Sequence, residues 1–190
     1  NIIFVSETLV MITWILELTI AFIIGSITAG ILVCQALGLK NPKTYGSTNI
    51  GASNVARQSL TAGAITLALD ALKGFLAIKF LSPHDSITLA VVAGHCFSPL
   101  LAFNGGKGVA TALGAVLASH PHIAYVLIFT WATVFSRKRV PASASIFCAI
   151  LLFIYGIANS NIWLGLTSAI ILMRHLPNVI NYNKPASTQA

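Results

Sequence analysis

The sequence predicts an all-α membrane protein, a bundle of seven transmembrane helices with an external N-terminus and a cytoplasmic C-terminus. Of its 190 residues, 56% are hydrophobic and only 8% are charged, and the mean hydropathy is +0.86. A soluble domain carries about 25% charged residues, so this chain has too little charge to cover a surface that faces water. Most of the chain is therefore expected to face lipid.

Charged residues, proline, glycine and asparagine divide the apolar sequence into seven candidate membrane spans. They are residues 8–36, 59–81, 86–103, 108–119, 122–136, 142–158 and 161–174. The fourth contains Gly108, Thr111 and Gly114, so it is expected to be a short or tilted helix that lines a cavity. The first is too long for a cleaved signal peptide. Because no repeat or linker interrupts the chain, residues 1–190 are expected to form a single domain.

The distribution of basic residues between the spans predicts their orientation. The odd-numbered breaks hold nine Lys or Arg residues, whereas the even-numbered breaks hold none. Lys and Arg near helix ends are retained on the cytoplasmic side, which places the odd-numbered breaks in the cytoplasm. The nine residues are Lys40, Lys43, Arg57, Lys107, Arg137, Lys138, Arg139, Arg174 and Lys184.

The net charge of +7 has two possible sources, nucleic-acid binding and membrane orientation. The basic residues are scattered between apolar runs without interleaved aromatic residues, so no nucleic-acid partner is expected. Cys34, Cys96 and Cys148 are far apart and lie inside apolar runs, which is typical of core thiols and not of metal ligands. No metal and no cofactor is expected.

The first polar cluster spans residues 46–57 and reads Gly-Ser-Thr-Asn-Ile-Gly-Ala-Ser-Asn-Val-Ala-Arg. Its glycines allow successive backbone N–H groups to point at an anion, and the guanidinium of Arg57 matches the shape of a phosphate. The alternative is a flexible polar loop in which a Ser or Asn caps a helix.

The second cluster, Phe-Asn-Gly-Gly-Lys-Gly-Val-Ala-Thr, spans residues 103–111. It lacks the Ser or Thr that follows the lysine of a Walker A loop, so nucleotide hydrolysis is not predicted. A Gly-Gly-Lys-Gly sequence at the start of a helix still combines free N–H groups, a positive helix end and an ammonium, which favours an oxyanion site. The alternatives are that Lys107 is only a topological anchor and that His95, just upstream, only packs between helices.

Two further groups of polar residues lie in or beside predicted spans. His175 and Asn178, in the segment Arg174-His175-Leu176-Pro177-Asn178, are three apart and would share one face of a continuing helix. A basic helix end capped by Asn is the alternative. Asp70 and Lys73 are also three apart and are expected to neutralise each other inside the membrane, with steering of the basic loop residues as the alternative role.

In this order, the motifs resemble those of the bacterial acyl-phosphate:glycerol-3-phosphate acyltransferase family, integral membrane enzymes that make lysophosphatidic acid in phospholipid biosynthesis. The resemblance covers nearly the whole chain, through residues 25–27, 46–57, 69–74, 94–95 and 105–111 to Arg174, His175 and Asn178. It implies a seven-helix bundle in the bacterial inner membrane, with an external N-terminus and an active site that faces the cytoplasm.

The resemblance also implies roles for individual residues. Ser47, Arg57 and Lys107 would hold phosphate groups, and His175 and Asn178 would orient the substrates. The backbone N–H groups of Gly105 and Gly106 would stabilise a tetrahedral oxyanion. The implied catalytic residues are Lys107, Ser47, His175 and Asn178, and the implied substrate-binding residues are Arg57, Asn49, Gly105, Gly106 and Ser143.

The implied reaction transfers an acyl group from acyl phosphate to sn-glycerol 3-phosphate and releases phosphate. It needs no cofactor and no covalent intermediate. The resemblance also implies that the phosphate of the donor receives the hydroxyl proton, which agrees with the lack of a clear protein base in the sequence. The two substrates and membrane lipid are the expected partners, and a monomer is the expected state.

Departures from the family pattern leave two alternatives open. Thr48 stands where the family usually has Gly, Asn104 stands where a basic residue is common, and Ser143 aligns with a phosphate-contacting Ser only after a shift. A divergent paralogue of low activity is one alternative. The other is a membrane transporter of phosphate-bearing metabolites, although the chain lacks the expected repeat symmetry. Neither a His-x-x-x-x-Asp pair nor a Gly-x-Ser-x-Gly motif is present, which disfavours acyl-CoA-type acyltransferases and serine lipases.

Overall fold

The computed structural model describes residues 2–180, and within that range every regular element is helical. The all-α class is therefore confirmed for the described part of the chain. The helices are α1 (Ile2–Ser26), α2 (Ala29–Ala36), α3 (Ala52–Val55), α4 (Leu60–Phe80), α5 (Asp85–Cys96), α6 (Val109–Ser119), α7 (Pro121–Lys138), α8 (Pro141–Ala158) and α9 (Ile162–Ile180), with short 3-10 helices η1 (Pro42–Thr44) and η2 (Pro99–Leu101).

Three of the expected spans differ from the observed helices, and the seventh, residues 161–174, differs at its end because α9 continues to Ile180. The expected first span, residues 8–36, is two helices, because α1 ends at Ser26 and α2 begins at Ala29. At the break, the carbonyl of Ile27 accepts a hydrogen bond from Lys73 Nζ at 2.7 Å instead of belonging to a continuous helix. The expected third span, residues 86–103, is helical only to Cys96, because Pro99 opens a 3-10 helix and Ala102 and Phe103 have positive φ angles.

Three segments within residues 2–180 are long and apolar enough to cross a bilayer, namely Ser6–Ala36, Leu60–Phe80 and Pro141–Ala158. Two shorter apolar segments, Asp85–Leu101 and Val109–Ser119, accompany them. A short helix is tolerated in a bundle whose neighbours satisfy its ends and shield it from lipid. An apolar multi-helix membrane protein follows from these segments, while the number of crossings remains a prediction.

Helices α4 and α6 pack with their backbones in contact. A Cβ atom added at Gly74 would lie 2.1 Å from the carbonyl oxygen of Thr111, and one added at Gly114 would lie 1.8 Å from that of Ala71. Small residues at such positions let helices approach closely, which is the usual means of helix association in membranes. This contact fixes the start of α6, and therefore the lysine that precedes it.

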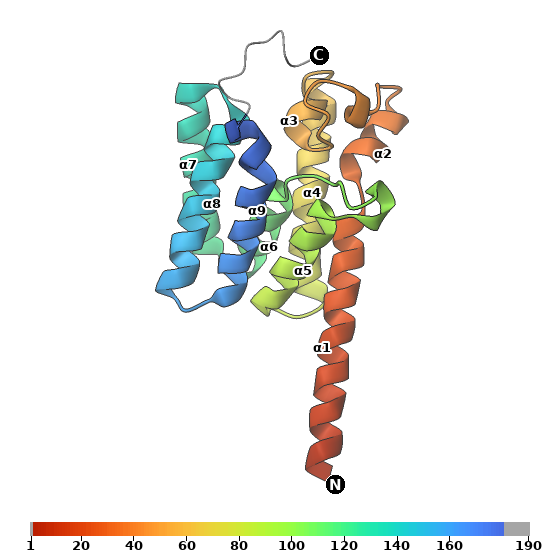
Figure 1. Ribbon diagram of the computed structural model, residues 1–190, viewed down its shortest axis with the longest axis vertical. Coiled ribbons are helices and arrows are strands. Elements are labelled where there is room, and N and C mark those ends of the chain that lie inside the picture. Colours follow the sequence, from red (N-terminus) through yellow and green to blue (C-terminus); the bar gives the residue numbers. More distant parts are fainter. Residues whose placement is uncertain (1, 181–190) are drawn as a thin grey trace.

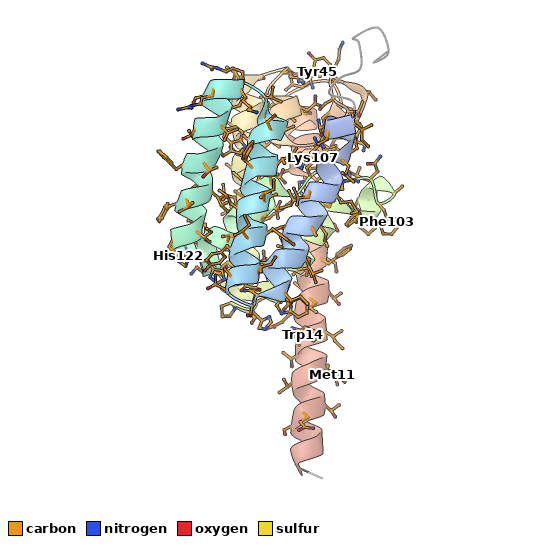
Figure 2. All side chains as sticks on the ribbon, turned by 60° about the vertical axis from the view of Figure 1, so that its left-hand side comes forward. Met11, Trp14, Tyr45, Phe103, Lys107 and His122 are labelled. Carbon is orange, nitrogen blue, oxygen red and sulfur yellow. The ribbon has the colours of Figure 1, made fainter. Side chains whose placement is uncertain are left out.

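The two ends of the bundle differ in charge. The links at one end contain no Lys or Arg, and they are joined there by Asp85, which accepts hydrogen bonds from His120 at 2.9 Å and Asn161 at 2.6 Å. The opposite end carries α3, the α7–α8 link and the end of α9, while α1 projects from the bundle in the other direction (Figure 1). Tyr45 and Lys107 lie toward that basic end, away from Trp14 and His122 (Figure 2).

Candidate functional site

The segment between α2 and α4 is an ordered turn built around one amide side chain. Asn54 is only 2% exposed. Its Nδ2 donates to the carbonyls of Pro42, Tyr45 and Asn49 at 2.8–3.0 Å, and its Oδ1 accepts the N–H of Ser47 at 2.9 Å. These hydrogen bonds favour a defined turn over a flexible polar loop for this segment. Asn54 replaces the backbone pairing that a helix or strand would otherwise supply.

The side chains predicted to contact substrate surround this turn. Ser47 and Arg57 are exposed. Asn49 is half-buried, and its Oδ1 already accepts the N–H of Gly51 at 2.8 Å, so it helps to shape the turn. The Arg57 side chain passes close to Gly46, where an added Cβ would lie 3.3 Å from Arg57 Cδ.

Thr48 adopts the left-handed conformation that the family pattern reserves for glycine, with φ of +56°. A β-branched residue at positive φ is a backbone outlier that costs on the order of 1–2 kcal/mol. Its exposed side chain makes only a local hydrogen bond, from Oγ1 to the carbonyl of Ser47 at 2.7 Å. The substitution is tolerated here at the expense of local strain.

Replacing Thr48 with glycine should raise the melting temperature of the detergent-purified protein by a few degrees. The gain is the strain relieved at φ of +56°, about 2 kcal/mol, reduced by the greater chain entropy of glycine in the unfolded state, about 1 kcal/mol. Thr48→Ala is the control, because it loses the hydroxyl but keeps the Cβ. A melting temperature for Thr48→Gly at or below that of Thr48→Ala would contradict the strain assignment.

The backbone around Gly105 and Gly106 is held on both sides. The N–H groups of Gly105 and Gly106 donate to the carbonyls of Cys96 and His95, both at 3.0 Å. Their own carbonyls accept hydrogen bonds from Arg174, through Nη2 at 2.7 Å and Nε at 3.0 Å. The prediction that these two N–H groups are free donors for an oxyanion is therefore wrong, because the last carbonyls of α5 already occupy them.

Lys107 follows this held peptide and points toward the end of α9. Its Nζ donates to Oδ1 of Asn178 and interacts electrostatically with Arg174 and His175. Burial, followed by the charge of Arg174, lowers the pKa of Lys107 to about 8. Gly108 comes next, with φ of +80°, and caps α6. The structure thus brings together the predicted residues Lys107, His175 and Asn178.

Helix α9 continues past Pro177 to Ile180, so His175 and Asn178 keep their helical spacing. His175 is 2% exposed, and its Nδ1 lies 2.8 Å from the carbonyl of Ile171. Since a carbonyl can only accept, Nδ1 carries the hydrogen and the neutral ring has Nε2 as a free acceptor. A side chain of this kind can orient a hydroxyl group.

Two cations bind residues 104–106, and Lys107, the next residue, lies within electrostatic range of one of them, Arg174. Lys43 Nζ donates to the carbonyl of Asn104 at 2.7 Å, and Arg174 and Lys107 complete the group. Burial and the charge of Arg174 lower the pKa of Lys43 as well. Within the described residues, the ion pairs of Asp70 and Asp85 go to Lys73, His95 and His120, so neither carboxylate neutralises the group. Clustered cations without a carboxylate partner form a site for an anion.

Ser143 lies apart from this cluster. It is half-buried in the first turn of α8, and its N–H donates to the carbonyl of Val140 at 3.1 Å. No hydrogen bond recorded for the described residues joins its side chain to Lys107 or Arg174. The substrate-binding role of Ser143 stays a prediction that the site geometry does not support.

Sequence reasoning did not assign a role in the site to Asn54, Lys43 or Arg174. One signal was present for Arg174, which lies four residues before Asn178 and therefore on the same helix face. In the sequence, Lys43 contributed only to the prediction of membrane orientation. Nothing in the sequence around Asn54 distinguishes it from the exposed polar residues nearby, because its role depends on the path of the whole turn.

A cluster of cations held by glycine-rich links at one end of an apolar helical bundle defines an integral membrane protein that handles an anionic ligand. The family model for glycerol-3-phosphate acyltransferase matches residues 15–184. The chain therefore belongs to the glycerol-3-phosphate acyltransferase family.

Individual relatives agree with this assignment. The chain is 38% identical over 182 residues to the glycerol-3-phosphate acyltransferase of Bordetella pertussis, with 85% of each chain covered. It is 35% identical over 185 residues to that of Laribacter hongkongensis, covering 89% of this chain and 92% of the relative. It also resembles the crystal structure of PlsY (YgiH), an integral membrane glycerol 3-phosphate acyltransferase, in its glycerol 3-phosphate form. The TM-score is 0.80 at 32% identity, covering 88% of this chain and 90% of the other.

Proposed function

We propose that this protein transfers an acyl group from acyl phosphate to the primary hydroxyl of sn-glycerol 3-phosphate, giving 1-acyl-glycerol 3-phosphate and inorganic phosphate. The observation that carries the proposal is the grouping of Lys43, Lys107 and Arg174 at the 104–107 link, where no carboxylate among the described residues pairs with them. Both substrates are anionic, so clustered cations lower the cost of bringing them together. The apolar helices beside the cluster suit the acyl chain of the donor.

The side chains of the site have separate roles in the proposed reaction. Ser47 and Arg57 bind phosphate at the ordered turn, and Lys107 stabilises the oxyanion that forms when the glycerol hydroxyl attacks the acyl carbonyl. Because the N–H groups of Gly105 and Gly106 are occupied, the ammonium of Lys107 supplies this stabilisation. His175 Nε2 and Asn178 orient the attacking hydroxyl. The carbon–oxygen bond to phosphate then breaks, and the departing phosphate takes the hydroxyl proton.

Purified protein in lipid provides the test of this reaction. Palmitoyl phosphate and glycerol 3-phosphate should yield lysophosphatidic acid and an equal amount of phosphate, and palmitoyl-CoA should be a poor donor. Phosphate release that is the same without glycerol 3-phosphate would indicate hydrolysis and contradict acyl transfer. Uptake of glycerol 3-phosphate into sealed vesicles without product would favour a transporter.

The reaction should slow at alkaline pH because of Lys107. Its pKa of about 8 means that the ammonium is present below pH 8 and is lost as the pH rises through that value. We therefore expect kcat/KM for glycerol 3-phosphate to fall up to about tenfold per pH unit above pH 8. An activity profile that stays level to pH 10 would show that the charge of Lys107 does not contribute.

We further propose that the protein crosses the bacterial inner membrane seven times, as a monomer, with the site facing the cytoplasm. The concentration of Lys and Arg at the end that holds Lys107 supports this orientation.

In a cysteine-free background, a cysteine at Thr44 or Lys138 should react with a membrane-impermeant maleimide only after the inner membrane is permeabilised. A cysteine at Ser119 should react from outside in intact cells. Labelling of the Thr44 position in intact cells would reverse the orientation of the whole site.

A further inference from the structure

Three buried polar side chains lie beneath the cation cluster, and the proposed reaction does not use them. Asp70 and Lys73 belong to α4, His95 belongs to α5, and their exposed fractions are 2%, 8% and 4%. The predicted pairing of Asp70 with Lys73 is confirmed, with Oδ1 and Nζ 2.8 Å apart. Exchanging a buried ion pair for apolar residues is often neutral or stabilising, so stability alone does not account for the pair.

Lys73 and Asp70 contact one edge of the His95 ring. An ammonium has three donors and no acceptor. Lys73 Nζ donates to the carbonyl of Ile27 at 2.7 Å, and it lies 2.8 Å from Asp70 Oδ1 and 2.9 Å from Nδ1 of His95. Nδ1 of His95 therefore lies between Lys73 Nζ at 2.9 Å and Asp70 Oδ1 at 3.4 Å, so both members of the pair hold this edge of the ring.

The other edge of the His95 ring supports the peptide that precedes Lys107. A Cβ atom added at Gly106 would lie 2.0 Å from His95 Nε2, so the ring is in contact with the backbone of Gly106. The carbonyl of His95 also accepts the N–H of Gly106 at 3.0 Å. Arg174 holds the same residue from the opposite side through its carbonyl. A shift of the ring would therefore move Lys107.

We infer that Asp70, Lys73 and His95 form a positioning trio, in which the ion pair fixes the ring of His95 and the ring sets the location of the Lys107 ammonium through Gly106. Its effect on turnover rests on the proposed function. Its effect on the location of Lys107 does not. The trio also ties the α1–α2 break to the site, because Lys73 donates to Ile27 at that break.

The first test replaces the pair as a unit, with Asp70→Asn/Lys73→Met. The double substitution leaves the net charge unchanged and avoids an isolated buried charge. Without Lys73 to hold it, the His95 ring should lose its fixed orientation. We expect kcat/KM for glycerol 3-phosphate to fall about 10- to 100-fold, the scale of a displacement of about 1 Å at a reacting centre.

The second measurement is the titration of Lys107, which does not require activity. Competitive acetylation with acetic anhydride at a series of pH values, quantified by mass spectrometry of the Lys107 peptide, reports its pKa. A loosened Lys107 becomes more hydrated, so its pKa should rise from about 8 by about one unit or more. The charged and titratable groups that face Lys107 are Arg174 and His175 from α9, with Lys43 beside Arg174, and the variant keeps all three.

The matched control is Asp85→Asn/His120→Gln at the opposite end of the bundle, where the two side chains are 2.9 Å apart. It also removes a partly buried ion pair that joins helices. It should lower the melting temperature without moving the Lys107 titration. A purely structural role for Asp70 and Lys73 predicts the same behaviour for both double variants.

His95→Asn provides an independent variant if the first one does not fold. Asparagine keeps an acceptor for Lys73 near the position of Nδ1 but removes the edge that touches Gly106, so the Lys107 pKa should rise here too. A folded variant of either kind with the wild-type Lys107 titration would overturn the inference. If the wild-type protein showed no acyl transfer, the proposed function would fail while the titration would still decide the role of the trio.

Discussion

Replacing Lys107 with alanine should lower kcat/KM for acyl transfer on the order of 100-fold or more, the scale expected when one preorganised oxyanion donor is removed. The expectation is stronger than the sequence alone suggested. The N–H groups of Gly105 and Gly106 are bonded to the last carbonyls of α5, so these two donors cannot take over. Steady-state kinetics with palmitoyl phosphate and glycerol 3-phosphate would measure the loss.

Lys107→Arg separates a site residue from a topological anchor. Arginine keeps the positive charge and therefore the orientation, but its planar fork is larger than an ammonium and would meet the guanidinium of Arg174. We expect little recovery of activity. If Lys107 is only a topological anchor, Lys107→Arg should leave acyl-transfer activity unchanged. Lys107→Ala should then also have nearly normal activity, because eight other basic residues remain in the inside links. Near-normal turnover by correctly inserted Lys107→Ala protein would remove Lys107 from the site.

Helix positions could be predicted well where a local residue marks the boundary. Residues 142–158 and 108–119 were expected, and α8 and α6 occupy Pro141–Ala158 and Val109–Ser119. Proline at the first position of α8 and the left-handed Gly108 before α6 are both signals that act within one turn of the chain. The α1–α2 break was not predicted, and the contact made there by the carbonyl of Ile27 is with Lys73, 46 residues away in the sequence.

The same distinction applies to the site. Lys107, His175 and Asn178 could be proposed together because the family resemblance implies roles for all three, whereas their local patterns alone left a topological anchor and a capped helix end as alternatives. The hydrogen bonds of the Gly105 and Gly106 N–H groups could not be predicted from the sequence. They depend on how the end of α5 packs against the 97–108 link. The organising role of Asn54 likewise requires the carbonyls of Pro42 and Tyr45 to be in place.

Gly114→Ala should be strongly destabilising, because the added Cβ would lie 1.8 Å from the carbonyl oxygen of Ala71. That oxygen belongs to the backbone of α4 and cannot rotate away, so the two helices must separate. We expect a loss of about 2–3 kcal/mol or more and a fall in melting temperature of roughly 5–10 °C. Differential scanning fluorimetry in detergent would measure it.

Gly165→Ala is the matched control, because it makes the same change inside α9, where no atom lies within 4 Å of the added Cβ. Alanine is favoured over glycine in a helix by about 0.5–1 kcal/mol, so this variant should melt at or above the wild-type temperature. Equal melting temperatures for the two variants would contradict the close α4–α6 contact. Because Lys107 lies two residues before α6, Gly114→Ala should also lose acyl transfer at temperatures where it remains folded. The Gly165→Ala variant should retain acyl transfer, because the substitution does not displace α9.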